Sequence, residues 1–229
     1  MSLILGIETS TKICSVAISR GNELLALEEA GGEYSHAEKL TDFIQKVLNR
    51  TNLVLKDMDA VAVSKGPGSY TGLRIGVSVA KGLCYSLDKP LIAVDTLQAM
   101  AKNVAAQTGD ENTLFCPMID ARRMEVYTAL YDINNKIIAS ITAKIIDEHA
   151  FATALSQHKI VFFGDGATKC KEVLAVHPNA LFFDEGLPSA QFINTIGLVH
   201  YQAKRWEDVA YFEPYYLKDF LATTPKKLL

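Results

Sequence analysis

A glycine-rich loop is the sharpest chemical feature of the sequence. Residues 65–72 read Lys-Gly-Pro-Gly-Ser-Tyr-Thr-Gly and join a β-branched stretch to an apolar segment. A loop of this kind before a helix can bind an anion, because the first N–H groups of the helix are unpaired and its dipole favours negative charge. Gly66 and Gly68 would then contact the phosphates of a nucleotide. The spacing matches neither the dinucleotide fingerprint nor a P-loop. A tight turn that requires glycine is therefore the favoured interpretation, with phosphate binding or contact with a partner protein as alternatives.

Glu8, Thr9 and Ser10 form a second candidate for nucleotide binding. They lie in a hydroxyl-rich turn between two short apolar stretches. A carboxylate can hold the Mg²⁺ of a nucleotide through water, and hydroxyls can hold it directly. Hydroxyls in turns mostly bond to their own backbone, so the pattern by itself is weak.

Arg122 and Arg123 are the candidates for contact with phosphate or RNA. They lie in the segment 120–125, where charges alternate at the turn between two expected strands. Phosphate oxygens are common partners of arginine. A solvated hairpin is the simpler alternative.

Patterns typical of a metal centre or a catalytic set are missing from the sequence. The five histidines form no H-x-x-x-H or H-E-x-x-H pair, and the four cysteines form no C-x-x-C pair. These are the spacings that zinc sites and redox pairs use. The sequence therefore predicts no metal ligand, no disulfide framework and no catalytic residue of its own.

The elements that must position these residues follow a similar order in both halves. Period-two patterns predict strands, and helical spacing after an S-x-x-E capping box predicts a helix over 35–49. The expected strands are 4–7, 13–19, 23–29, 59–64, 91–95, 113–120, 125–132, 136–143 and 159–163, and the other expected helices are 72–86, 147–157 and 188–205. Each half reads β-β-β-α-β-α, so we expect an α/β protein with subdomains 1–102 and 103–229.

The helix after the glycine-rich loop has one face of small residues. Gly72, Gly76 and Ala80 repeat at intervals of four. Glycine in a helix costs about 1 kcal/mol relative to alanine, so close approach of another backbone would compensate for it. The helix is apolar nearly all round, which predicts that it is either internal or packed against another chain.

The composition and net charge exclude some classes of protein. The 229 residues are 49% hydrophobic, with 23 Lys and Arg against 26 Asp and Glu, giving a formal charge of -3. This argues against a broadly basic surface that coats nucleic acid. A bilayer-spanning run of about 20 apolar residues is missing, and Glu8 interrupts the N-terminus before a signal-peptide core could form. We therefore expect a cytoplasmic protein with no membrane contact.

Several motifs together resemble the bacterial TsaB family, formerly called YeaZ. They are ILGIETST at 4–11, SHAE at 35–38, SKGPGSYTGLRIG at 64–76, VDTL at 94–97, IDAR at 119–122 and GDGA at 164–167. The resemblance covers essentially the whole chain, and the glycine-rich block is its most specific part. It implies an actin/Hsp70/sugar-kinase (ASKHA) fold with two similar subdomains, each with a mixed sheet and flanking helices, the last helix returning to the first subdomain.

The resemblance also implies a function without catalysis by this chain. In that family TsaB is the dimerisation partner of TsaD, which transfers threonylcarbamoyl to N6 of the adenosine beside the anticodon of tRNA, and TsaE is an ATPase of the same assembly. TsaD carries the metal-binding histidines, so ATP and a divalent metal are expected in the partner subunits and no cofactor in this chain. We expect a homodimer when the chain is alone, and tRNA contact through the complex.

Two helices pack against TsaD in that family, and the resemblance carries this contact onto the helices over 35–49 and 72–86. The expected interface residues are Leu40, Phe43, Ile44, Val47, Gly72, Gly76, Val79, Ala80 and Leu83. Glu8 stands where many relatives have Asp, which lowers the expectation of a nucleotide site. The alternative function is a small-molecule kinase or ATPase of the same fold. A glycoprotease, the older label of the superfamily, would need a metal or nucleophile that the sequence does not show.

Overall fold

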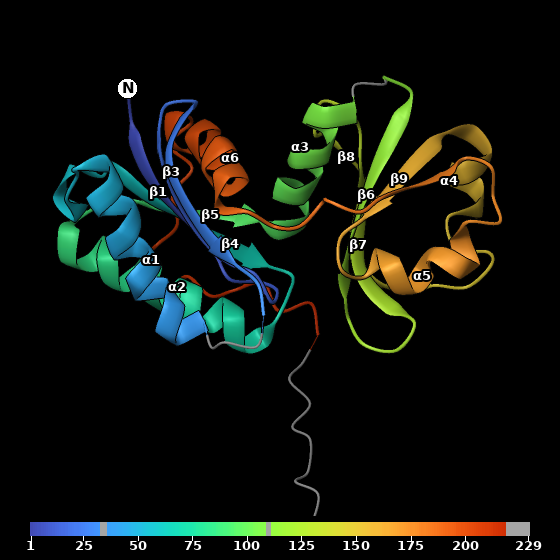
Figure 1. Ribbon diagram of the computed structural model, residues 1–229, viewed down its shortest axis with the longest axis horizontal. Coiled ribbons are helices and arrows are strands. Elements are labelled where there is room, and N and C mark those ends of the chain that lie inside the picture. Colours follow the sequence, from blue (N-terminus) through green and yellow to red (C-terminus); the bar gives the residue numbers. More distant parts are fainter. Residues whose placement is uncertain (33–35, 109–110, 219–229) are drawn as a thin grey trace, which may run out of the picture.

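Alternating apolar side chains along β1 (Leu3–Glu8) set the layers of the first subdomain. Leu5 and Ile7 pack against helices on one face of the sheet, and Ile4 packs against helices on the other. This alternation follows from the period of two along a strand. The computed structural model describes residues 1–32, 36–108 and 111–218, and the described chain forms two such layered bodies beside each other (Figure 1).

The two sheets share one topology. Their strand orders are β3-β2-β1-β4-β5 and β10-β9-β6-β7-β8. In each, the first three strands along the chain pair antiparallel, and the remaining two continue the sheet in parallel. The other strands are β2 (Cys14–Arg20), β3 (Glu23–Ala30), β4 (Ala60–Gly66), β5 (Leu91–Asp95), β6 (Thr113–Asp120), β7 (Glu125–Tyr131), β8 (Ile137–Ile145), β9 (Lys159–Phe163) and β10 (Ala180–Phe183). The prediction of two similar subdomains with mixed sheets is confirmed.

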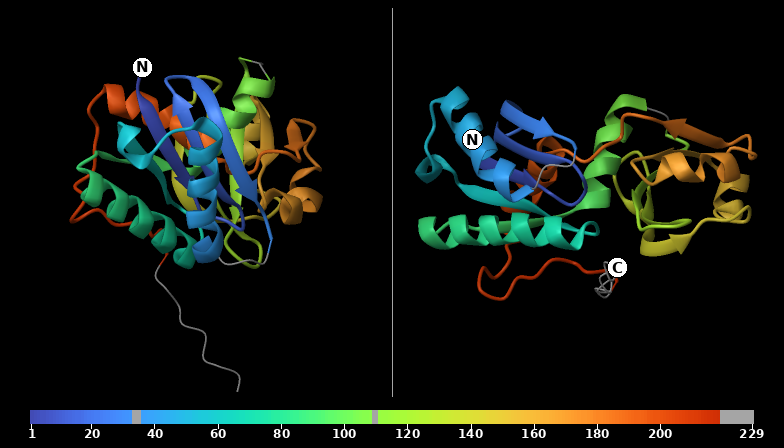
Figure 2. Two further views of the ribbon diagram at one scale, coloured as in Figure 1. Left: turned by 60° about the vertical axis from the view of Figure 1, so that its left-hand side comes forward. Right: turned by 60° about the horizontal axis from the view of Figure 1, so that its bottom comes forward.

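Helices cover both faces of each sheet (Figures 1 and 2). They are α1 (His36–Thr51), α2 (Tyr70–Leu87), α3 (Thr96–Thr108), α4 (Ala152–Gln157), α5 (Ala167–Leu174) and α6 (Ala190–Gln202), with a short 3₁₀ turn at Leu55–Asp57. Helices α1 and α2 share the core on one side of the first sheet, and α6 packs on the other side. Helices α4 and α5 cover the second sheet on the side away from α3.

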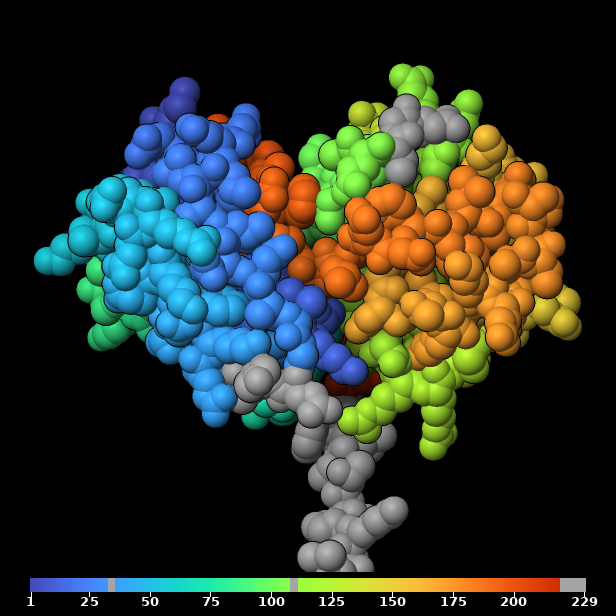
Figure 3. Space-filling model, in the orientation of Figure 1, coloured from blue at the N-terminus to red at the C-terminus, as the bar shows by residue number. Residues whose placement is uncertain are grey.

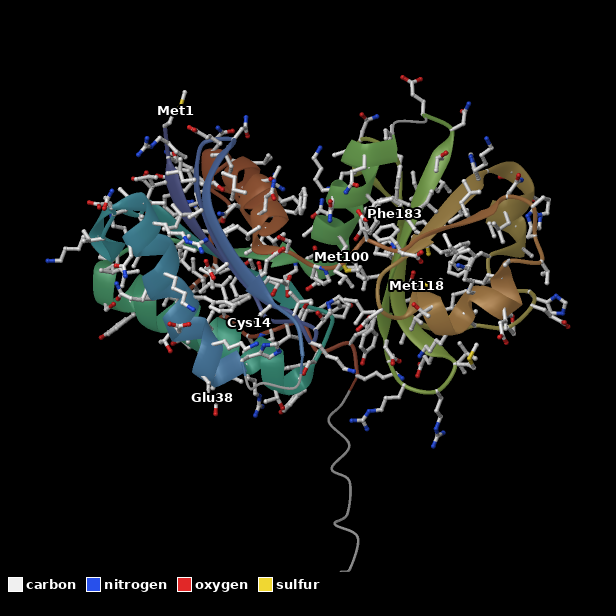
Figure 4. The ribbon with its side chains drawn as sticks, viewed as in Figure 1. Met1, Cys14, Glu38, Met100, Met118 and Phe183 are labelled. Carbon is white, nitrogen blue, oxygen red and sulfur yellow. The ribbon has the colours of Figure 1, made fainter. Side chains whose placement is uncertain are left out.

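Helix α3 lies between the two bodies. Met100 of α3 and Phe183 of β10 belong to one apolar cluster on the inner face of the second sheet (Figure 4). Helix α6 contacts α3 while it packs on the first sheet. The expected boundary at 102–103 therefore does not separate the two bodies, because α3 begins at Thr96 and the chain returns to the first sheet at α6.

The segment after α6 runs back along α2. Lys81 of α2 donates hydrogen bonds to the carbonyl oxygens of Ala210 at 3.1 Å and Phe212 at 2.9 Å. Farther on, Lys218 pairs with Glu125 of the second sheet. We call residues 203–218 the C-terminal strap, since they touch both bodies. Among the described residues no helix is both long and apolar enough to cross a bilayer.

Candidate functional site

The glycine-rich loop packs on the β1–β2 hairpin. A side chain at Gly68 would collide with the carbonyl oxygen of Ser10. The N–H of Ser69 donates to that same oxygen at 2.6 Å. The glycine is thus required by close contact between two backbone segments of one chain.

The other end of the loop lies beneath the C-terminal strap. Gly66 has φ +113°, and a side chain there would meet the Tyr215 carbonyl oxygen at 2.8 Å. The N–H of Tyr215 donates to the carbonyl oxygen of Lys65 at 2.7 Å. The favoured interpretation of the loop, a turn that needs glycine, agrees with these contacts.

The three polar residues of the hairpin are sealed from solvent. Glu8, Thr9 and Ser10 are each 0% exposed. One Glu8 carboxylate oxygen accepts from the Ser10 N–H at 2.6 Å and the Ser64 hydroxyl at 3.0 Å. The structure therefore brings the candidate nucleotide contacts together, but it packs them against one another instead of around an open site.

Glu8 is an unusual buried carboxyl. Burial raises its pKa above the ordinary value, and the hydrogen bonds from Ser10 and Ser64 only partly offset this. Its second oxygen, Oε2, is buried without a partner among the described residues. Because burial penalises the charged form, the environment favours the neutral carboxylic acid.

The small face of α2 is internal. Gly72 lies against the carbonyl oxygen of Thr9, and Gly76 lies against the hydroxyl of the same residue. That hydroxyl donates to the Gly72 carbonyl oxygen at 2.8 Å. Ala80 is 0% exposed. The small size of the two glycines is thus explained by close approach of Thr9 in the β1–β2 hairpin of the same chain, and the role of these residues at a partner interface stays a prediction.

The predicted contact residues of α1 are also internal. Leu40, Phe43, Ile44 and Val47 are at most 6% exposed and pack with the first sheet. Leu40 also lines the groove between α1 and α2, whereas Phe43, Ile44 and Val47 pack into the core against the sheet. The chain itself covers most of this face, and the place of these residues at a partner interface stays a prediction. Figure 4 shows Glu38 pointing outward from α1 and Cys14 on its inner side.

An open surface remains along the outer sides of the same two helices. A shallow groove runs between α1 and α2, and its lining residues are Ala37, Leu40, Thr41, Arg74, Ile75, Ser78 and Val79. Val79 and Leu83 keep partly exposed side chains. These two remain candidates for contact with a partner.

Gly82 is not among the predicted interface residues. It is exposed in the middle of α2, and a side chain built there would meet nothing within 4 Å. It lies three residues after Val79 and seven after Ile75, so it continues the groove side of the helix. The signal was available in the spacing, but it lay on a different stripe from Gly72 and Gly76.

The C-terminal strap contacts Arg74 at one end of the groove. The Arg74 guanidinium lies 4.1 Å from the ring centre of Tyr70. Its Nε–H donates to the Tyr216 hydroxyl at 3.1 Å. The Tyr216 ring centre lies 5.9 Å from the same guanidinium, and the Arg74 side chain remains exposed.

The β6–β7 hairpin carries the two predicted phosphate contacts. Arg122 and Arg123 are exposed, with φ values of +73° and +49°. Asp120 pairs with Lys169 of α5. Burial alone would raise the pKa of Asp120, but the hydrogen bonds from Lys169 and the Arg122 N–H outweigh it, and the pKa is lowered.

Residue types that bind metals are scattered. In the described ranges, no three His, Cys, Asp or Glu side chains gather closely enough to hold an ion. The four cysteines are buried and unpaired with one another. Burial raises the pKa of Cys14 to about 11, so this thiol stays protonated at neutral pH.

Comparison with known proteins gives consistent matches. The family model described as "TsaD: tRNA N6-adenosine threonylcarbamoyltransferase" matches residues 31–220. A Haemophilus influenzae protein named tRNA threonylcarbamoyladenosine biosynthesis protein TsaB is 28% identical over 98% of this chain and 96% of its own length. The Bacillus subtilis protein of the same name is 36% identical over 60% of this chain, a match that spans 58% of the relative's length.

Solved structures agree with the sequence matches. YeaZ from Pseudomonas aeruginosa superposes with a TM-score of 0.83 at 25% identity, over 95% of this chain and all of that one. The activator of 2-hydroxyisocaproyl-CoA dehydratase from Clostridium difficile superposes with a TM-score of 0.52 at 10% identity, over 89% of this chain and 97% of that one. The second match shows the fold alone, which is the ASKHA type.

Proposed function

This chain belongs to the TsaB family of tRNA threonylcarbamoyladenosine biosynthesis proteins, and from that premise we propose that it is a non-catalytic scaffold subunit. Its partner is a TsaD-like catalytic subunit, with a TsaE-like ATPase in the same assembly. Together they transfer threonylcarbamoyl to N6 of the adenosine next to the anticodon of tRNA. ATP and the divalent metal belong to the partner subunits in this proposal.

The observation that carries the proposal is the exposed groove between α1 and α2. Its walls are apolar or small, from Ala37 and Thr41 on one helix to Ile75 and Val79 on the other. Gly82 extends it with an open backbone that no part of the described chain approaches. A helix glycine without an internal reason is costly, so close approach of another chain is its most direct explanation.

The predicted contact surface is therefore revised within the same two helices. The buried residues, such as Leu40 and Gly76, hold the helices on the sheet, and the outer stripe with Val79, Gly82 and Leu83 meets the partner. The same stripe would pair two copies when the chain is alone. Homodimer and catalytic subunit then compete for one surface.

The alternative, a kinase or ATPase, needs the β1–β2 hairpin to hold a nucleotide. Thr9 and Ser10 are fully buried, and the glycine-rich loop lies on them. ATP binding at this hairpin would require the loop to lift away. Titration calorimetry of the isolated chain with Mg-ATP tests this, and saturable heat would favour the alternative.

Reconstitution tests the scaffold role. Transfer of threonylcarbamoyl to tRNA is measured with the catalytic subunit, the ATPase and the adenylate-forming enzyme, with and without this chain. We expect transfer only when the chain is present, and none from the chain alone. Full transfer in its absence contradicts the proposal.

A further inference from the structure

The acidic residues beside Arg122 and Arg123 are already engaged. Asp120 pairs with Lys169, and Glu125 pairs with Lys218 of the C-terminal strap. Within the described part of the chain, neither guanidinium has a hydrogen-bond or ion-pair partner. The alternating charges in the sequence thus do not form ion pairs with one another. The positive charges of the two arginines are left without an ion-pair partner among the described residues.

The backbone of the hairpin tip holds both arginines in an unfavourable conformation. Both have positive φ, a region that disfavours residues with a Cβ. The β7–β8 hairpin meets the same demand with Asn135, a residue type that tolerates it better. The backbone conformation therefore gives no reason for arginine at either position of the β6–β7 tip. The reason must lie in what the two side chains do.

The other body contributes a third cation near the base of this tip. Lys12 is exposed on the β1–β2 hairpin, and its charge acts on Asp120 and Asp165 of the second subdomain. Figure 3 shows the β1–β2 hairpin in dark blue and the β6–β7 hairpin in yellow-green, on either side of a hollow at the lower centre. The dark red strap is visible between them.

We infer that Arg122 and Arg123, with Lys12 across the hollow, bind the phosphate backbone of the tRNA substrate. This rests on the proposed function, in which the assembly acts on tRNA. Guanidinium groups present paired donors that match phosphate oxygens, and contacts to phosphate position an RNA without reading its sequence. The surface is small, which agrees with a chain whose net charge is -3 and with most RNA contact lying on other subunits.

Neutralising the arginines tests the inference on the reconstituted complex. Binding of tRNA is titrated at several salt concentrations with the wild type and with Arg122→Gln/Arg123→Gln. We expect affinity to fall on the order of tenfold at low salt, and the slope of log K against log salt to shrink by about 0.7 to 0.9 for each phosphate that the variant no longer neutralises. Arg122→Lys/Arg123→Lys should keep the slope and reduce the affinity only in part.

A matched control removes the same number of charges elsewhere. Arg20→Gln/Lys136→Gln changes exposed cations at the far end of β2 and in the β7–β8 hairpin, at the strand ends opposite to the β1–β2 and β6–β7 hairpins. It should bind tRNA like the wild type. Unchanged affinity and salt slope for the Arg122→Gln/Arg123→Gln complex would overturn the inference. So would failure of that variant to associate with the catalytic subunit, because the tip would then bind an acidic protein surface.

The experiments distinguish failure of the phosphate-binding inference from failure of the proposed function. If omitting the chain leaves tRNA modification intact, the scaffold role fails whatever the arginines do. If the chain is required, the variant assembles normally and tRNA affinity is unaffected, only the phosphate-binding inference fails.

Discussion

Two glycines in α2 should respond in opposite ways to the same substitution. Gly82 has open space around it, so Gly82→Ala gains only the helix propensity of alanine. We expect the monomeric chain, measured at a concentration too low for homodimers, to be stabilised by about 0.8–1.0 kcal/mol, which raises Tm by roughly 2–4 °C in a protein of this size. At Gly76 the new methyl group meets the Thr9 hydroxyl, which is buried and hydrogen-bonded to Gly72. Overpacking of this kind costs about 1–3 kcal/mol and exceeds the propensity gain.

Association with the catalytic subunit supplies the second readout. Gly82→Leu should leave the chain folded and weaken the complex by at least tenfold, since a leucine stands where a partner backbone must approach. Ser156→Leu, an exposed small-to-large change on α4, is the matched control and should associate normally. Calorimetric titration measures both. Unaltered affinity of Gly82→Leu would refute the reasoning, as would destabilisation of the isolated chain by Gly82→Ala.

Three further variants test separate parts of the structure. Folding raises the pKa of Glu8, so the neutral carboxyl stabilises the fold below the unfolded pKa, and this contribution is lost as pH rises through the folded pKa. The Glu8→Gln variant stays neutral at every pH. Denaturant titrations should therefore show Glu8→Gln gaining stability relative to the wild type as pH rises. Arg122→Gly/Arg123→Gly should raise the free energy of unfolding by about 1 kcal/mol or more, because glycine adopts positive φ without strain. A free energy of unfolding no higher than that of the wild type would show that the backbone of the tip is unstrained. Leu40→Ala should cost the isolated chain about 2–5 kcal/mol, since the side chain is 1% exposed; a stable variant with weak association would restore Leu40 to the interface.

Sequence patterns predicted the first helix and, among the strands of the described chain, every one except β10. The alternation that makes β1 to β3 is local, and so is the helical spacing of α1 after its start at His36. The cap residue predicted for that helix, Ser35, lies outside the described residues. Similar order in the two halves was enough to predict two related subdomains.

Elements without local boundary signals were missed. Helix α3 begins at Thr96 directly after β5 ends at Asp95, so no turn residues separate them. Helix α5 has no side-chain cap, and β10 has only four residues. Helix α4 starts at Ala152, later than predicted, after Phe151 with φ +64°. A backbone conformation of this kind cannot be recognised from residue type.

Periodicity alone does not say what covers a helix face. The small face of α2 was expected to admit a partner, whereas Thr9, distant in sequence, fills it. A turn rich in hydroxyls and a turn rich in glycine each looked able to hold phosphate. Only their mutual contact, with Ser69 bonded to Ser10, shows that each is closed by the other.

The most direct measurement is the rate of tRNA modification as the concentration of this chain is increased, for the wild type and for Gly82→Leu. If the chain assembles a catalyst located elsewhere, both curves should reach the same plateau, with Gly82→Leu needing a higher concentration. A lower plateau at saturation, or an undiminished rate without the chain, would contradict a scaffold that acts through the α1–α2 groove.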